Sequence, residues 1–251
     1  MIDYWEGRTV AEITRETCQR YVLTRKRSAG TTRRELGVLR AAINHAHREG
    51  RLTRTVSIAL PQRPESRDRW LTRSEAARLL RAALREPRVR LHLPLFILLG
   101  LYTGHRKEAI LALRWSQVDL DASRLNFNSG GDRRSNKRKA LIPIPRKLHN
   151  HLKRARQRGS ELGFVGHENG HRLKDIKGGF ASACMRASLR DVTPHVLRHT
   201  CATWLMMKGV PVWEAAGWLG MSRETLERVY GHHHPNYLLS AEQACPPTLV
   251  R

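Results

Sequence analysis

Two imidazoles and one guanidinium occur close together in the segment His195-Val196-Leu197-Arg198-His199-Thr200. In a helix, residues spaced i, i+3 and i+4 share one face, so all three polar side chains would point the same way. Pro194 suits the first turn of a helix, where free N–H groups and the helix dipole favour anions. Farther along the chain lies Tyr230, whose hydroxyl could attack a phosphate held by such cations. The spacing therefore predicts phosphoryl-transfer chemistry.

A second candidate group lies in Thr103-Gly104-His105-Arg106-Lys107-Glu108, between two apolar helical segments. Gly104 permits a tight turn. Arg106 could then project into a cleft, and Glu108 could orient it. Taken alone, the pattern is equally typical of a helix junction with a solvated arginine.

A third group is strongly basic, with five cations in Arg133-Arg134-Ser135-Asn136-Lys137-Arg138-Lys139. We predict that this segment forms a hairpin that grips phosphates. One lysine could also protonate a leaving oxygen as a general acid.

Metal chemistry is disfavoured by the sequence. His195 and His199 have a spacing that zinc can use, but Val196 stands where the metalloprotease pattern has a glutamate. The run His232–His234 has no partner ligands at a suitable spacing, so we predict a polar turn there. The four cysteines are scattered and form no CxxC pair. We therefore predict no metal site and no cofactor.

The charge balance points to a polyanionic partner. The chain of 251 residues has 46 Lys and Arg against 22 Asp and Glu, a net charge of +24. Nucleic acid is the commonest polyanion, and the basic residues are not gathered in one amphipathic helix that would favour a membrane surface. No apolar run is long enough to span a bilayer, and no signal peptide is evident. Cysteines without a disulfide pattern suggest a cytoplasmic protein.

The elements that must position these residues fall into two parts. Residues 9–26 and 31–48 have helical apolar patterns, and a Pro-rich polar stretch follows. We predict a helical domain over residues 1–62, a linker over 63–69 and a second domain over 70–251. In the second domain Thr72 and Glu75 form a capping box. Residues 118–145 suggest a small sheet. The helices expected around that sheet cover residues 72–84, 91–102, 107–113, 146–158, 174–189, 195–208, 211–218 and 222–229.

In this order the motifs resemble those of the tyrosine recombinase (phage integrase) family. The family pattern has an arginine in a TGxRxxE context, a lysine in a β-hairpin, HxxR, a His or Trp in an LGH-like context, and a tyrosine nucleophile nine residues later. Here Leu219-Gly220-Met221 fills the LGH position, and Tyr230 follows at that spacing. The resemblance covers roughly residues 69–240.

The resemblance implies a mainly α fold with a small antiparallel β-sheet. It implies a helical N-terminal DNA-binding (core-binding) domain and a mixed α/β catalytic domain. It also implies site residues. The catalytic set would be Arg106, Lys137, His195, Arg198 and the nucleophile Tyr230, with Glu108, Met221, His232 and Lys139 as accessory residues and Arg133, Arg134 and Arg138 as DNA contacts.

The implied activity is that of a site-specific DNA recombinase or integrase that cuts and rejoins double-stranded DNA through a 3′-phosphotyrosyl intermediate. Tyr230 would attack, Arg106 and Arg198 would neutralise the non-bridging oxygens, and His195 would accept the tyrosine proton or bind the phosphate. Neither metal nor ATP would be needed. The resemblance also implies a homotetramer on DNA, no membrane association, and a bacterial or phage-encoded protein of the nucleoid in the cytoplasm.

Departures from the family pattern keep other functions open. Met221 stands where the family has His or Trp and cannot donate a hydrogen bond to a phosphate; His232 could substitute. The hairpin lysine of the family usually follows a threonine, whereas this chain has Ser135-Asn136-Lys137, so we favour Lys137 and place Lys139 second. The first domain is also short, which leaves a truncated domain open. A catalytically weakened DNA-binding relative is therefore one alternative, and a type IB topoisomerase-like DNA-relaxing enzyme is another. A metal-dependent phosphodiesterase that uses the histidines is the third.

Overall fold

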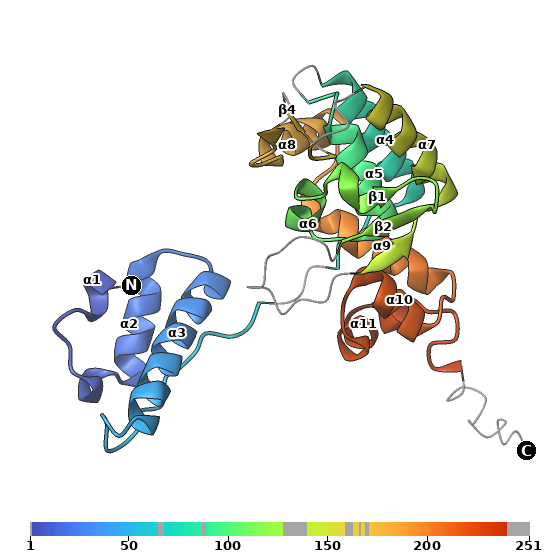
Figure 1. Ribbon diagram of the computed structural model, residues 1–251. Helices are drawn as coiled ribbons and strands as arrows, with labels where there is room; N and C mark the ends of the chain where they lie inside the picture. The colour runs from blue at the N-terminus through green and yellow to red at the C-terminus, as the bar shows by residue number, and fades with distance from the viewer. Residues whose placement is uncertain are drawn as a thin grey trace, which may run out of the picture. The chain divides into compact units, whose positions relative to one another are not determined.

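The computed structural model describes residues 2–64, 68–86, 89–127, 140–158, 163–165, 167–168 and 171–239. The chain divides into two compact units, Met1–Arg67 and Asp68–Arg251 (Figure 1). Each unit has its own buried apolar core. Among the described residues, no helix combines the length and the apolar character that crossing a bilayer requires.

The first unit is helical. Its elements are α1 (Ile2–Trp5), a 3-10 turn η1 (Val10–Glu12), α2 (Arg15–Arg25) and α3 (Ala29–Arg48). The helix expected over 9–26 is interrupted, because the Thr14 hydroxyl accepts from the Thr17 amide and so caps α2. Tyr21 is buried in the core and donates to Glu35 of α3 at 2.6 Å, which joins the two long helices.

The second unit begins with the predicted capping box. The Thr72 hydroxyl accepts from the Glu75 amide at 3.2 Å, and the Glu75 carboxylate accepts from the Thr72 amide at 2.8 Å. These bonds start α4 (Arg73–Arg85) and confirm the prediction.

The centre of this unit is the apolar helix α5 (Leu93–Thr103), which packs along α9 (Pro194–Met207) (Figure 1). The helices approach closely at Gly100, where an added Cβ would lie 2.7 Å from Leu197 Cδ1. Gly104 ends α5 in the left-handed conformation, with φ 63°. A Cβ there would collide with Leu219 and Cys201, so the turn that precedes Arg106 requires glycine.

The small sheet expected within 118–145 is present. Its strands β1 (Val118–Asp119), β2 (Arg124–Asn126) and β3 (Leu141–Pro143) are antiparallel in sequence order. Leu125 is buried and pairs with Val118 on one side and Ile142 on the other. The basic segment 133–139 between β2 and β3 lies outside the described residues.

Further elements complete the second unit. A second pair of short strands, β4 (His167–Glu168) and β5 (His171–Arg172), was not expected from the sequence. The other α-helices lie near their expected ranges: α6 (Lys107–Leu111), α7 (Arg146–Arg158), α8 (Lys177–Arg186), α10 (Val212–Leu219) and α11 (Arg223–Tyr230). Two 3-10 turns, η2 (Trp115–Gln117) and η3 (Gly231–His233), were not among the expected helices. The fold is thus mainly α with a small antiparallel sheet, as the sequence predicts.

Candidate active site

A cavity of about 250 Å³ opens between the turn after α5 and the start of α9. Arg106 lines it together with His195 and Arg198, which lie far from Arg106 in the chain. Its other lining residues are His105, Lys107, Lys177, Thr193 and Pro194. Four cationic side chains therefore face one small space. This concentration of positive charge favours the binding of an anion.

The start of α9 directs two of these residues into the cavity. Thr193 precedes the helix in an extended conformation, and Pro194 occupies its first position. His195 and Arg198 are three residues apart and share the face toward the cavity. The intervening Val196 and Leu197 are buried in the core on the other side. The predicted face of this helix is confirmed.

Arg198 lines the cavity and also holds two backbone segments together. Its Nη1 donates to the carbonyl oxygens of Gly104 and Leu219, each at 2.7 Å. The side chain is buried, and burial together with the neighbouring Arg106 lowers the pKa of its guanidinium to about 10. Arg198 is thus still charged at neutral pH, and its orientation is fixed by the turn after α5 and the end of α10.

Arg106 lies at the cap position before α6 and is half-buried at the cavity. The expected orienting partner points elsewhere. Glu108 is exposed, and its carboxylate pairs with Lys107 at 3.1 Å and with Arg172 at 3.1 Å. Lys107 also binds Asp175 at 3.0 Å. Glu108 therefore belongs to an ion-pair network beside the cavity, and the structure does not place it as the group that orients Arg106.

Tyr230 is the last residue of α11 and is only 4% exposed. Its hydroxyl lies 2.7 Å from Nδ1 of His199. His199 comes from the same segment as His195 and Arg198, and its ring contacts the His195 ring edge-on at a centroid distance of 4.7 Å. A line of rings therefore runs from Tyr230 through His199 to His195 at the cavity.

Burial governs the acidity of Tyr230. It raises the pKa of the hydroxyl to about 12, and the opposing effect of Arg198 is smaller. The positive charge of Arg198 therefore favours ionisation of Tyr230, but burial outweighs it. The protonated hydroxyl can donate, and His199 Nδ1 accepts this hydrogen bond in the tautomer that carries its proton on Nε2.

Two imidazoles, those of His195 and His199, lie where one was expected from the sequence. His195 faces the cavity, and the pKa of its ring is lowered because nearby protein atoms displace water and because Arg198 and Arg106 repel a further positive charge. His199 is half-buried, and the pKa of its ring is also lowered. Burial is the larger cause, and the positive charge of His195 is the next. The hydroxyl of Tyr230 contacts His199, so His195 is not its proton acceptor in this arrangement.

The other accessory residues lie away from the cavity lining. Met221 packs against the apolar cluster formed by α9, α10 and α11. His232 faces Asp68, with Nε2 3.5 Å from the carboxylate. The remaining expected residues, Arg133, Arg134, Lys137, Arg138 and Lys139, lie outside the described residues.

Sequence reasoning did not single out His105 as a site residue. Its ring is 6% exposed and stacks on Phe127 at 3.7 Å, just where β2 leads into the basic segment. Nδ1 lies 3.1 Å from the Thr103 carbonyl and must donate to it, which leaves Nε2 as a bare acceptor. This Nε2 is buried and finds no hydrogen-bond partner in the part of the chain that the structure describes. Burial lowers the pKa of His105 to about 4, so the ring is a neutral acceptor beside four cations.

Comparison with known proteins identifies similar chains. The model of a family described as the phage integrase family matches residues 69–236. The integrase of Salmonella phage P22 is 28% identical over 235 residues, which are 84% of this chain and 56% of that protein. A shufflon-specific DNA recombinase of Escherichia coli is 30% identical over 177 residues, 68% of this chain and 42% of that protein. The chain thus spans about half the length of these curated relatives.

A solved structure shows the same fold. A lambda integrase dimer bound to a COC′ core site superposes with a TM-score of 0.70 and 19% identity, over 98% of this chain and 68% of that one.

Proposed function

This chain belongs to the phage integrase family, and we propose that it cuts and rejoins DNA strands through a phosphotyrosyl intermediate. The reaction would be site-specific recombination or integration, without metal or ATP in the chemical step. The first unit would be the DNA-binding domain and the second unit the catalytic domain.

One observation carries the proposal: Arg106 and Arg198 line one small cavity together with His195. Guanidinium groups stay charged and can form paired hydrogen bonds to phosphate oxygens. Two of them at one cavity would stabilise the charge that builds on the non-bridging oxygens during phosphoryl transfer. Lys107 and Lys177 at the same cavity add to the attraction for a phosphate.

The remaining steps follow from the contacts of Tyr230. As Tyr230 moves from its buried position toward the cavity, its proton would pass to His199 Nδ1, which it contacts at 2.7 Å in the structure, and its oxygen would form a bond to the scissile phosphorus. The bond from phosphorus to the 5′ oxygen breaks, and that oxygen takes a proton from a lysine of the basic segment, Lys137 or Lys139. Rejoining is the reverse sequence, and the phosphotyrosyl bond conserves the energy that it needs.

The proposed substrate is double-stranded DNA. The net charge of +24 supports a polyanionic partner, and the solved lambda integrase relative is bound to a core site. Arg133, Arg134 and Arg138 are the proposed contacts of the basic segment with the backbone. We also propose a tetramer as the recombining assembly.

Removal of the Tyr230 hydroxyl tests the proposal. A duplex with a nick beside the cleavage position traps the covalent complex, which denaturing electrophoresis resolves. We expect Tyr230→Phe to form no DNA-linked protein while it binds the duplex as the unmodified chain does. The matched control is Tyr237→Phe, which removes the hydroxyl of an exposed tyrosine nearby in the sequence and should leave the complex intact.

A DNA-linked species that persists in Tyr230→Phe would overturn the assignment of the nucleophile. Absence of the covalent complex in the unmodified chain, with DNA binding retained, would favour the weakened relative. Met221 at the usual His or Trp position is the observation behind that second candidate. Relaxation of supercoiled plasmid without strand exchange would favour the topoisomerase-like enzyme.

A further inference from the structure

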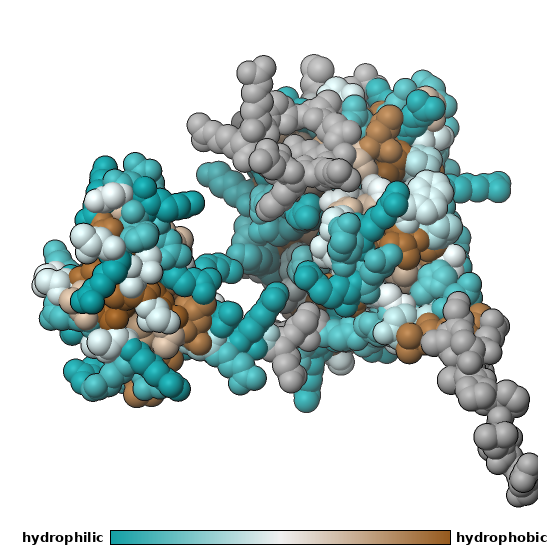
Figure 2. All heavy atoms as spheres, turned by 90° about the horizontal axis from the view of Figure 1, so that it is seen from below, coloured by the Kyte–Doolittle hydropathy of each residue, from teal (hydrophilic) through white to brown (hydrophobic). Residues whose placement is uncertain are grey.

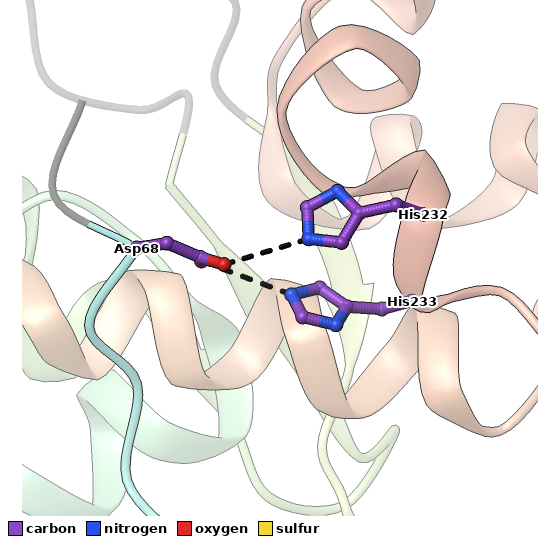
Figure 3. Close-up of side chains that lie close together, drawn as sticks. All are labelled: Asp68, His232 and His233. Atoms are coloured by element: carbon purple, nitrogen blue, oxygen red, sulfur yellow. Dashed lines mark ion pairs between the residues drawn. The ribbon is translucent and has the colours of Figure 1, made fainter. Parts of the chain in front are cut away.

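Three side chains converge beside the segment that follows Tyr230. Asp68 lies at the start of the second unit, and His232 and His233 lie on η3. Figure 3 shows both imidazoles turned toward the Asp68 carboxylate. One donor atom from each residue lies within 4.8 Å of the others.

The distances are too long for good hydrogen bonds. Nε2 of His232 is 3.5 Å from Asp68 Oδ2, and Nε2 of His233 is 3.8 Å from Asp68 Oδ1. An N–H···O bond normally spans about 2.7–3.2 Å. A tetrahedral zinc ion with ligands at about 2.0–2.2 Å holds neighbouring ligand atoms roughly 3.3 Å apart. The two gaps to Asp68 are thus close to the spacing that a bridging ion requires, and all three donor atoms lie within 4.8 Å of one another.

Burial supports the same interpretation. The His233 Nε2 is buried and has no hydrogen-bond partner among the described residues, so only the long contact with Asp68 is available to it. The Trp70 ring lies at the edge of the His233 ring, at a centroid distance of 6.2 Å. Asp68 and His232 remain about half exposed, with side-chain exposures of 56% and 45%. An ion could enter from that side and keep a water as a further ligand.

We propose that Asp68, His232 and His233 bind a transition-metal ion of the Zn²⁺ type. Two imidazoles and one carboxylate suit zinc and similar divalent ions, whereas Mg²⁺ and Ca²⁺ prefer oxygen ligands. The site is separate from the cavity lined by Arg106 and Arg198 and supplies no chemistry to it. This proposal replaces the metal-free polar turn that the sequence predicts for 232–234.

The ion would inhibit Tyr230 by holding it in its buried position, and we call this effect the brake. His232 and His233 follow this tyrosine almost directly, and a metal bond to Asp68 would fix their backbone. The buried hydroxyl, bound to His199, would then be held in place. This regulatory part rests on the proposed function, because it matters only if Tyr230 must leave its buried position to reach a phosphate.

Zinc binding can be measured without DNA. Calorimetric titration of the full chain with ZnCl₂ is expected to show about one ion bound per chain at this site. Asp68→Asn, His232→Ala and His233→Ala should each weaken that binding at least about tenfold, since removal of even an outer-shell partner has effects of this size. MgCl₂ should give no comparable binding.

The neighbouring His234 provides the matched control. Its Nδ1 accepts from the Asn236 amide and it is not among the three ligands, so His234→Ala should bind zinc as the unmodified chain does. Thermal unfolding without metal confirms that each variant folds. Zinc binding that is absent in the unmodified chain, or unchanged in the three ligand variants, would overturn the site.

Hydrogen exchange tests the brake on Tyr230 separately from zinc binding. Zinc should slow exchange of the amides of residues 229–233 in the unmodified chain and in His234→Ala, but not in Asp68→Asn. Zinc should likewise slow formation of the covalent DNA complex in the unmodified chain and leave Asp68→Asn unaffected. Binding without slower exchange would disprove the brake. Slower exchange in a chain that never forms the DNA complex would instead count against the proposed function.

Discussion

At the scale of single residues, the contact between Tyr230 and His199 determines the state of the proposed nucleophile. The hydroxyl is buried, its pKa is raised to about 12, and its partner is an imidazole whose own pKa is lowered. A neutral imidazole can accept the tyrosine proton as the oxygen attacks, so burial of the hydroxyl and its activation depend on the same pair.

Replacement of His199 by alanine should therefore slow formation of the covalent complex by about 10²–10⁴-fold, the usual contribution of a positioned general base. Single-turnover cleavage of the nicked duplex measures this rate. Because burial lowers the pKa of His199 below 6.5, the unmodified chain should lose rate only as the pH falls below that value, when the imidazole becomes protonated. The cleavage rate of His199→Ala should not show this fall at acidic pH.

The exposed His151 on α7 provides the control, and His151→Ala should cleave at the unmodified rate. Unchanged cleavage in His199→Ala would mean that the contact with Tyr230 serves packing alone.

Glu75 yields a prediction about stability and pH. The carboxylate binds Arg69 at 2.7 Å and the Thr72 amide, and Arg69 makes the largest contribution in lowering its pKa to about 2 from 4.5. Because the folded pKa is depressed, the stabilisation is complete above about pH 4.5 and is lost as the pH falls toward 2. Glu75→Gln should thus lower the free energy of unfolding by up to about 3 kcal/mol at neutral pH and by little near pH 2.

Urea unfolding at several pH values measures this difference. The exposed Glu214 serves as the control, and Glu214→Gln should have a small effect throughout. A loss of stability in Glu75→Gln that persists unchanged at pH 2 would contradict the role of the ionised carboxylate.

The placement of residues that lie close together in the chain could be predicted from their spacing. His195 and Arg198 share a helical face by their i, i+3 spacing, so their common direction could be predicted. The partner of Tyr230 could not, because the choice between two imidazoles depends on how α11 packs on α9. Asp68 carries no local signal at all, since its relation to His232 exists only in the folded chain.

At the scale of elements, the approach of α5 to α9 positions Arg198 relative to Arg106. The two helices pack closely because Gly100 has no side chain where it meets Leu197. A methyl group there must displace Leu197, which lies next to Arg198 in the chain. Gly100→Ala should therefore reduce stability by about 1–3 kcal/mol, as overpacking does.

Gly217 of α10 is the matched control within the same unit. It is exposed, and an added Cβ meets nothing within 4 Å. Gly217→Ala should stabilise by about 0.5–1 kcal/mol, because alanine loses less backbone entropy in a helix. Thermal unfolding of both variants checks the pair. Equal effects of the two substitutions would contradict a tight contact at Gly100.

Long helices and caps could be predicted, and very short elements could not. The apolar stripe and the Thr72–Glu75 spacing predicted α4 and its start correctly. The strands β4 and β5 have two residues each, which is too short for any periodicity to show. The break before α2 was missed because the pattern of apolar residues continues across the turn that Thr14 caps.

At the scale of the whole molecule, charge is the dominant property. The side of the molecule seen in Figure 2 is mainly hydrophilic on the second unit, with apolar atoms in smaller patches. The excess of Lys and Arg amounts to a net charge of +24. Binding to DNA through such a surface releases counterions and must weaken as salt rises.

We expect the logarithm of the DNA association constant to fall linearly with the logarithm of salt concentration. If about six phosphates are contacted, the slope should be about −5. Fluorescence anisotropy with a labelled duplex between about 50 and 200 mM salt measures it. A flat response would remove DNA from the proposed function, whatever the cleavage assay shows.

The two hydrogen bonds from Arg198 to backbone carbonyls predict which site residues should persist during evolution. Its Nη1 holds the carbonyls of Gly104 and Leu219, so the fold needs this guanidinium whether or not a phosphate is ever bound. Arg106 has no carbonyl partner of that kind among the described residues and is freer to drift once selection for cleavage ends. If the proposed cleavage activity were lost, a descendant should therefore keep Arg198 and lose Arg106 first, so Arg106 is the better marker of an active enzyme.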